Sequence, residues 1–494
     1  MARCATDYLT ADRKGRHTMF FRQVFDPELA QYAYILGCQR TGEALVIDPE
    51  RDIDRYLQIA SEEGLRIVAA TETHIHADFL SGLREFGEQH DVKLYISDEG
   101  DANWKYNWAR DSNYNVHLLK DNDEFMIGNI RVQALHTPGH TPEHMSFLIT
   151  DMGGGANEPI GIVSGDFVFV GDLGRPDLLE TAAGVTGARE PSARRLFEST
   201  KRFLALEDHV QVWPGHGAGS ACGKALGAVP MSTVGYERKF NAALNFDTEE
   251  SFIGSILDGQ PEPPLYFARM KDLNKNGVPL LGDLPAPKLF PIEELVARGT
   301  AEGAVIVDTR SDRVSFMAGH IPGSLYAPLG INFAMIVGSY VEPSTNIYLI
   351  TDAADVDLAV RILVRIGYDG IKGFAPPTTM LTSGVAGEVV PRVAFPDIGA
   401  EIDTDKWTVL DVRGAAEFEG SHIPGAINIA HTRLAARINE VPRDKPVMTY
   451  CRSGNRAAAA SSLLAREGFE VTYVDGAFAH WAELSETTEP AGAA

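Results

Sequence analysis

The sequence contains few cysteines, no long apolar run and a shortage of basic side chains. Its four cysteines, at positions 4, 38, 222 and 451, are too scattered for a disulfide framework, which favours a reducing compartment. No apolar stretch approaches the length that crosses a bilayer. Residues 1–17 also lack the apolar core of a secretory signal. We therefore expect a cytoplasmic protein without a membrane segment.

The shortage of basic residues restricts the binding partners. Forty-four Lys and Arg against sixty-eight Asp and Glu leave a formal net charge of −24. Such a charge repels nucleic acid and anionic membranes, and it gives no general attraction for an anionic substrate. Any anion site must therefore be built locally from a few side chains and backbone N–H groups.

The length of 494 residues exceeds what one ordinary core supports, and we expect three domains. Residues 18–250 alternate strand and helix patterns, as an α/β domain does. A segment rich in proline and glycine follows, and it predicts an extended connector over residues 251–285. The remaining chain predicts two smaller domains, at residues 286–390 and 395–490.

These two smaller domains are predicted from an internal repeat. V-I-V-D-T-R at 305–310 followed by G-H-I-P-G-S at 319–324 corresponds to V-L-D-V-R at 409–413 followed by S-H-I-P-G-A at 421–426. An internal duplication explains the pairs most simply. Each copy alternates buried strands with helices, so each should form a small parallel-sheet α/β domain of about a hundred residues.

Four histidine and aspartate motifs in the first domain follow apolar strands. They are T-E-T-H-I-H-A-D-F at 71–79, H-T-P-G-H-T-P-E-H at 136–144, V-S-G-D at 163–166 and V-W-P-G-H-G at 212–217. One H-x-H alone is as often two polar residues at a strand end, but four elements in this order predict a metal site. The order resembles the metallo-β-lactamase fold, which implies an αββα sandwich for the first domain.

Phe79 favours one metal ion over two. Two ions would require Asp78, a histidine at position 79 and His216 around the second ion, with Asp166 as the bridge. A phenyl ring cannot coordinate, and its apolar surface makes an incompletely ligated ion costly to hold. One ion is favoured, with two imidazoles and one carboxylate. That set leaves positions open for oxygen and substrate and suits ferrous iron.

The motifs resemble those of the persulfide dioxygenases, iron enzymes of this fold that oxidise the outer sulfur of a thiol persulfide to sulfite. The resemblance implies one Fe(II) per chain, held by His74, His140 and Asp166. Hydrogen bonds to the iron ligands or to bound water are then expected from other nearby polar residues. The candidates are His76, Asp78 and His216.

Two further residues near these motifs have two interpretations each. Arg175, in G-D-L-G-R-P-D, either contacts a substrate carboxylate or forms a salt bridge with Asp177. Cys222 follows His216 by six residues in a glycine-rich stretch, where it either holds or relays a persulfide or is a buried, inert cysteine. We assign no role to His136 and His144.

The second copy of the repeat carries a cysteine motif. The strand P-V-M-T-Y runs into C-R-S-G-N-R at 451–456 and then an alanine-rich helix, so backbone N–H groups and the helix amino terminus should stabilise a thiolate. The motif and its order resemble the rhodanese family. The resemblance implies that Cys451 carries sulfur as a persulfide and that Arg456 or Arg452 neutralises a bound sulfonate.

The first copy lacks this cysteine. Where the second copy has M-T-Y-C-R-S-G-N-R, the first has Y-L-I-T-D-A-A-D-V, and we place Asp352 at the cysteine position. An aspartate cannot carry sulfur, and nearby acidic residues repel an anion. Residues 286–390 are therefore expected to be a catalytically silent rhodanese-like domain.

Together the domains resemble fusions of a persulfide dioxygenase with rhodanese domains. The resemblance implies a role in sulfide detoxification or sulfur metabolism, with a thiol persulfide of the glutathione or coenzyme A type, O2, sulfite and thiosulfate as small-molecule partners. The carrier thiol, the direction of sulfur transfer, the role of the silent domain and assembly into a homo-oligomer stay open.

Alternatives from other classes also remain. A zinc hydrolase of the glyoxalase II kind uses the same fold to attack a thioester. Phosphatases and arsenate reductases use a related cysteine loop, but theirs has one more residue between Cys and Arg. The four residues between Cys451 and Arg456 favour sulfur chemistry.

Overall fold

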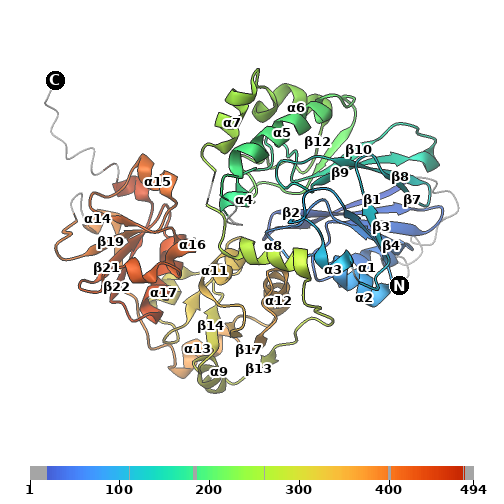
Figure 1. The fold of residues 1–494 in the computed structure, drawn as a ribbon. Coiled ribbons are helices and arrows are strands. Elements are labelled where there is room, and N and C mark those ends of the chain that lie inside the picture. Colours follow the sequence, from blue (N-terminus) through green and yellow to red (C-terminus); the bar gives the residue numbers. More distant parts are fainter. Residues whose placement is uncertain are drawn as a thin grey trace, which may run out of the picture. The chain divides into compact units, whose positions relative to one another are not determined.

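A computed structural model describes residues 19–110, 112–181, 186–260, 262–398, 402–481 and 483 (Figure 1). Its contacts divide the chain into two compact units. The first comprises Met1–Gln260 and Met270–Gly282, and the second comprises Pro261–Arg269 and Asp283–Ala494. Among the described residues, no helix is long and apolar enough to cross a membrane.

The first unit contains two six-stranded sheets. One has the order β1-β2-β3-β4-β5-β6 and the other β12-β11-β10-β9-β8-β7. The strands of the first sheet are β1 (Met19–Asp26), β2 (Gln31–Cys38), β3 (Glu43–Ile47), β4 (Arg66–Thr71), β5 (Lys93–Ser97) and β6 (Val116–Leu119). Those of the second are β7 (Glu124–Ile127), β8 (Ile130–His136), β9 (Met145–Asp151), β10 (Gly161–Gly165), β11 (Gln211–Pro214) and β12 (Ser232–Thr233).

The two sheets pack face to face, and helices cover their outer faces. Tyr34 and Leu36 from β2 share one buried cluster with Phe147 from β9 and Trp213 from β11. Helices α1 (Asp54–Glu62) and α2 (Leu83–His90) cover the first sheet, and α5 (Arg189–Leu204) and α7 (Glu249–Leu257) cover the second. The remaining helices of the unit are α3 (Asn107–Arg110), α4 (Leu178–Thr181) and α6 (Val234–Phe240). The predicted αββα sandwich is confirmed.

The segment predicted as an extended connector contains helices. Helix α7 begins just before residue 251, and α8 (Tyr266–Asn276) follows. The prolines and glycines at 258–264 and 277–282 flank these helices instead of interrupting them. Within α7, Phe252, Ile253 and Ile256 recur at helical spacing and are buried against the outer layer of the first unit. The high proline and glycine content of the whole segment obscured this short helical periodicity of apolar residues.

The second unit contains two parallel sheets with the same strand order, β13-β17-β16-β14-β15 and β18-β22-β21-β19-β20. The first copy contains β13 (Lys288–Leu289), α9 (Ile292–Gly299), β14 (Ala304–Asp308), α10 (Arg313–Ala318), β15 (Leu325–Tyr326), α11 (Phe333–Tyr340), β16 (Asn346–Ile350), α12 (Val356–Arg365), β17 (Ile371–Ala375) and α13 (Pro377–Ser383). The second contains β18 (Arg392–Ala394), α14 (Phe395–Ile398), β19 (Thr408–Asp411), α15 (Ala415–Gly420), β20 (Ile427–Asn428), α16 (His431–Leu434), β21 (Val447–Tyr450), α17 (Asn455–Arg466) and β22 (Val471–Asp475). The matching order confirms the internal repeat of two small parallel-sheet α/β domains.

Strand register corrects one predicted correspondence between the copies. Asp308 pairs with Ile350 in the first copy, and Asp411 pairs with Tyr450 in the second. The residue after each pair is Thr351 and Cys451, so Thr351, not Asp352, occupies the cysteine position. Thr351 is 1% exposed, and its hydroxyl has no hydrogen-bond partner in the described chain. A threonine also lacks a sulfur nucleophile, so the expectation of a silent domain does not change.

Candidate metal centre and sulfur-carrier loop

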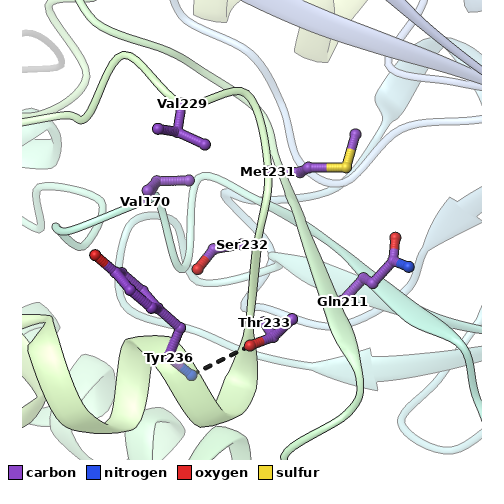
Figure 2. Close-up of a pocket in the computed structure, with 7 residues that line it drawn as sticks. All are labelled: Val170, Gln211, Val229, Met231, Ser232, Thr233 and Tyr236. Carbon is purple, nitrogen blue, oxygen red and sulfur yellow. Dashed lines mark hydrogen bonds between the residues drawn. The ribbon is translucent and has the colours of Figure 1, made fainter.

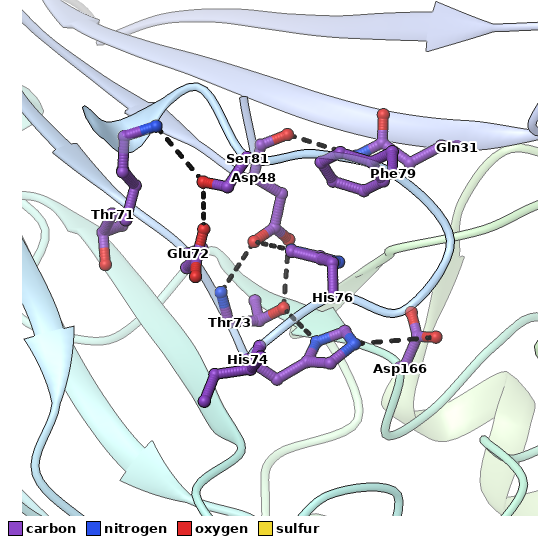
Figure 3. Close-up of polar contacts among 12 residues, drawn as sticks. Gln31, Asp48, Thr71, Glu72, Thr73, His74, His76, Phe79, Ser81 and Asp166 are labelled. Carbon is purple, nitrogen blue, oxygen red and sulfur yellow. Dashed lines mark hydrogen bonds and ion pairs between the residues drawn. The ribbon is translucent and has the colours of Figure 1, made fainter. Parts of the chain in front are cut away.

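The predicted metal residues lie on loops that follow β4, β8, β10 and β11. These strands come from both sheets, so the loops meet at one edge of the sandwich. His74, Asp166 and the residues around them come together there (Figure 3). The fold therefore brings the histidines and aspartates of the four sequence motifs together at one place.

His74, His140 and Asp166 form a compact group of donor atoms. One ligand atom from each lies within 4.8 Å of the others, and all three residues are buried. His140 Nε2 is 3.5 Å and His74 Nε2 is 4.0 Å from Asp166 Oδ2. The structure thus brings together the three residues to which the resemblance assigned the iron.

Hydrogen bonds on the far side of each ring orient the imidazoles. His140 Nδ1 donates to the carbonyl of Arg175 at 3.0 Å, and His74 Nδ1 is 3.0 Å from the Thr73 hydroxyl. Each ring then presents Nε2 to Asp166. Such partners fix the orientation and raise the basicity of metal-binding histidines.

Asp166 provides the test of whether a cation fits. Both of its carboxylate oxygens are buried and accept no hydrogen bond within the described chain. Burial raises the pKa of Asp166 to about 6 and lowers the pKa of His140 to about 4. A carboxylate without donors beside neutral imidazoles is costly to bury, and a divalent cation would satisfy all of these groups.

A second buried donor group lies beside the first. Asp78, His216 and Cys222 also place one ligand atom each within 4.8 Å of one another. His216 Nε2 is 3.3 Å from Asp78 Oδ2 and 3.5 Å from Asp166 Oδ1. Phe79 supplies no ligand at this position, but Cys222 supplies a third donor atom, which the prediction of one ion did not include.

Cys222 is a thiol in an unfavourable place for negative charge. It is 2% exposed, and burial together with the carboxylates of Asp166 and Asp78 raises its pKa well above the ordinary value. The neutral thiol is therefore favoured unless a cation lies beside it. The structure places Cys222 next to the predicted iron ligands, and its function stays a prediction.

His76 lies beside the donor groups, with Nδ1 3.9 Å from Asp78 Oδ1, and Asp48 holds its other ring nitrogen. Its Nε2 is 3.1 Å from Asp48 Oδ1, and its ring packs on Phe79 with ring centroids 4.3 Å apart. Burial acts against the charged imidazolium, but Asp48 outweighs it and raises the pKa of His76 to about 9. Asp48 also accepts the Thr73 N–H at 2.6 Å. His76 and Asp48 together therefore brace the loop that carries His74.

Several residues that position the site escaped the sequence reasoning. The backbone N–H of Asp166 donates to His144 Nε2 at 3.1 Å, although His144 was given no role. Glu143 accepts the Ile75 N–H at 2.8 Å. Asn274, on α8, donates to the carbonyls of His76 at 2.8 Å and Phe79 at 2.7 Å. The strand-end position of Asp48 was a usable signal, whereas nothing in the sequence marked Asn274.

Of the two interpretations of Arg175, the structure shows the salt bridge with Asp177. Its Nε and Nη2 donate to both carboxylate oxygens of Asp177, at 2.8 and 2.6 Å, and Nη1 donates to the carbonyl of Ala221 at 3.1 Å. The side chain is fully buried. In this arrangement Arg175 holds its own backbone carbonyl against His140 instead of offering a free guanidinium to a substrate.

A mostly apolar cavity of about 520 Å³ lies along β11 and β12 in the first unit (Figure 2). It is lined by Val170, Gln211, Val229, Met231, Ser232, Thr233 and Tyr236. The lining includes none of the predicted site residues.

Cys451 lies at the turn between β21 and α17. It is 1% exposed, and its Sγ accepts the backbone N–H groups of Gly454 at 3.1 Å and Ala457 at 3.4 Å. Backbone N–H groups aimed at sulfur stabilise a negative charge on it. The structure thus forms the predicted cradle around Cys451.

The two arginines of this loop differ in their surroundings. Arg456 donates to both carboxylate oxygens of Glu417, at 2.5 and 2.8 Å, and this pairing lowers the pKa of Glu417 against the opposing effect of burial. Arg452 is exposed. The structure places both arginines on the cysteine loop, and their contact with a sulfonate stays a prediction.

The fold and the two sites define a metal-binding enzyme scaffold joined to a domain built around a cradled cysteine. Residues 26–216 match the Metallo-beta-lactamase superfamily, and residues 396–484 match the Rhodanese-like domain. The crystal structure of a metallo-beta-lactamase from Staphylococcus aureus subsp. aureus COL is 41% identical, with a TM-score of 0.65, over 73% of this chain and 99% of that one. The chain belongs to the metallo-beta-lactamase superfamily and carries a C-terminal rhodanese domain.

Curated relatives match about half of the chain or less. The mitochondrial persulfide dioxygenase ETHE1 of Bos taurus is 26% identical over 248 residues, which are 48% of this chain and 83% of that protein. The probable metallo-hydrolase YqgX of Bacillus subtilis is 28% identical over 190 residues, 35% of this chain and 80% of that protein. Relatives whose names state different chemistry thus match this chain at similar identity.

Proposed function

We propose that the protein is a persulfide dioxygenase fused to a sulfurtransferase. The main observation behind this proposal is that one chain contains both the donor group of His74, His140 and Asp166 and a cysteine, Cys451, that accepts backbone N–H groups. The similarity to persulfide dioxygenases supports the choice among the activities of this fold. Both proposed reactions use thiols and persulfides, and we propose that they take place in a reducing cytoplasm, where thiols stay reduced.

The first unit would bind one Fe(II) through two imidazoles and one carboxylate. That set leaves coordination positions open, and the iron would supply activation of O2 there. The chain itself holds His140 through the Arg175 carbonyl and positions Asp166 through His144. In the overall reaction a thiol persulfide, O2 and water give the thiol, sulfite and two protons.

The second site would act by nucleophilic sulfur transfer. The Cys451 thiolate attacks the outer sulfur of a persulfide, forms a cysteine persulfide and releases the thiol. Sulfite then attacks that outer sulfur, thiosulfate leaves and the thiolate is restored. The N–H groups of Gly454 and Ala457 would stabilise negative charge on Cys451 in both steps. The sulfite made at the first site is thus a substrate of the second.

A zinc-dependent thioester hydrolase remains the second candidate. The donor group of Asp78, His216 and Cys222 favours it, because soft thiolate ligands select zinc and a second ion is typical of hydrolytic sites. The number and kind of metal ions distinguish the two functions.

Metal analysis tests the proposed centre. We expect about one iron per chain in protein purified with full activity, because His76 is hydrogen-bonded to Asp48 and Phe79 supplies no ligand, which leaves His216 as the one imidazole of the second donor group. Inductively coupled plasma mass spectrometry on the active protein measures the ratio. Two tightly bound ions per chain, or zinc in place of iron, would support the hydrolase.

The first rhodanese-like repeat should transfer no sulfur. A full-length Cys451→Ser variant keeps this repeat intact, with Thr351 at its cysteine position, so it should make no thiocyanate from thiosulfate and cyanide above the buffer blank. Thiocyanate formation by this variant at even a tenth of the parent rate would contradict the assignment.

A further inference from the structure

The silent repeat touches the loop that carries Cys451. Arg313 begins α10 of the silent repeat, and its Nη1 donates to Asn455 Oδ1 at 2.7 Å. Its Nε donates to Asp475 Oδ1 at 3.0 Å. Asn455 is the first residue of α17 and lies within the cysteine loop, so one guanidinium links the silent repeat to the carrier loop and to the end of β22.

Arg313 contacts the cysteine loop beside Gly454, where the backbone is closely packed. Gly454 has a φ of +95°, and a Cβ added there would lie 2.6 Å from Tyr473 Oη, 3.1 Å from Asp475 Oδ1 and 3.2 Å from Arg313 Nε. Arg313 thus forms part of the wall against which Gly454 rests. The N–H of the same glycine is the nearer of the two that point at the Cys451 sulfur.

We propose that Arg313 of the silent repeat is a positioning residue for sulfur transfer at Cys451. It fixes the turn at Gly454 and Asn455, and the turn aims the Gly454 N–H at the sulfur. Arg313 does not contact the sulfur. The inference rests on the proposed sulfur-carrier function of Cys451, and it gives the silent repeat a role in a reaction that it cannot perform.

Other contacts hold the two repeats together without Arg313. The Tyr326 N–H donates to Ser462 Oγ at 2.9 Å, and Arg466 Nη1 donates to the Gly323 carbonyl at 2.6 Å. Both contacts lie away from the cysteine loop. Loss of Arg313 should therefore leave the repeats docked, and its effect should be confined to the loop.

Removal of Arg313 leaves Asp475 with other hydrogen-bond donors, but it takes from Asn455 the guanidinium that donates to its Oδ1. Asp475 also accepts hydrogen bonds from Tyr473 Oη at 2.7 Å and from Arg392 Nη1 at 3.2 Å. Arg392 shares Asp475 with Arg313 and makes no hydrogen bond to the cysteine loop. It offers a matched control, because its removal takes one charge from Asp475 and leaves Asn455 as it is.

The test compares full-length Arg313→Ala and Arg392→Ala. Two readouts are the kcat and KM of thiosulfate:cyanide transfer and the rate at which iodoacetamide alkylates Cys451 at neutral pH, followed by peptide mass spectrometry. For Arg313→Ala we expect kcat and the alkylation rate each to fall about tenfold, the effect of weakening one hydrogen bond to a charged atom. Arg392→Ala should stay within about twofold of the parent.

Arg313→Lys is a further variant. Lysine is a point charge without the fork that reaches Asn455 and Asp475 together, so kcat should recover only partly. The inference is overturned if Arg313→Ala lowers the melting temperature but leaves both rates unchanged. It is also overturned if Arg392→Ala causes an equal loss. If the parent protein transfers no sulfur, the proposed function fails, whereas the alkylation rates still report on positioning by Arg313.

Discussion

An Asp166→Asn variant is expected to bind no iron and to consume no oxygen with a thiol persulfide, while sulfur transfer at Cys451 continues. The neutral amide keeps the shape of the side chain but removes the only charged ligand of the group, and the buried imidazoles cannot hold a dication alone. Oxygen uptake should fall by at least about 100-fold, more than the loss caused by mutating a partner of a metal ligand. An oxygen electrode and metal analysis measure both effects.

Asp208→Asn is the matched control, because Asp208 lies in the same unit with a side chain that is 66% exposed. It should keep the parent's iron content and oxygen uptake. The assignment of Asp166 would be contradicted if Asp166→Asn retained more than a tenth of the parent rate, or if sulfur transfer at Cys451 were lost together with oxygen uptake.

A Cys451→Ser variant should continue to consume oxygen but should change the product. Serine is nearly isosteric and far less nucleophilic at neutral pH, so it cannot carry sulfur. With excess persulfide the parent protein should pass a sulfur from Cys451 to newly made sulfite and release thiosulfate. The variant should stop at sulfite. Ion chromatography of the two anions distinguishes these outcomes.

Cys38→Ser serves as the control, since Cys38 is a buried cysteine on β2 whose Sγ accepts the Asn129 N–H at 3.3 Å. It should leave the ratio of sulfite to thiosulfate unchanged. If Cys451→Ser still made thiosulfate as fast as the parent, beyond the uncatalysed reaction of sulfite with persulfide, then Cys451 would not be the carrier. Cys222, beside the metal residues, would become the candidate.

The fold and the first donor group were predictable because they follow from periodicity and strand ends. His74, His140 and Asp166 each follow an apolar strand, and in an α/β fold such loops collect at one edge. The cysteine loop was equally readable, since a strand that runs into a glycine-containing turn and a helix directs N–H groups to one point. Short sequence patterns are enough to predict strand-end loops of this kind.

Contacts between distant segments were not predictable in this way. Asn274 reaches the carbonyls of His76 and Phe79 from a helix almost two hundred residues later, in a segment whose prolines suggested an extended chain. Arg313 reaches Asn455 from the preceding repeat. No spacing rule connects residues so far apart, because only the packing of whole elements decides which of them meet.

Strand register also identifies which residue of the first copy corresponds to Cys451. The position of Cys451 is occupied by Thr351 in the first copy, because the strand pairs of Asp308 and Asp411 fix the correspondence. Position-by-position comparison of Y-L-I-T-D at 348–352 with M-T-Y-C-R at 448–452 gives the same residue, so the placement of Asp352 was a one-residue error of alignment. Its consequence was small because neither threonine nor aspartate offers a sulfur nucleophile.

The central claim is that the metal site oxidises a persulfide and does not hydrolyse a thioester. The most direct measurement follows oxygen consumption by the iron-loaded full-length protein with glutathione persulfide, coenzyme A persulfide and a glutathione thioester in parallel. We predict oxygen uptake with a persulfide only, with one O2 consumed for each sulfur atom recovered as sulfite in the Cys451→Ser variant. Hydrolysis of the thioester by the zinc-loaded protein, without oxygen uptake on either persulfide, would contradict the account.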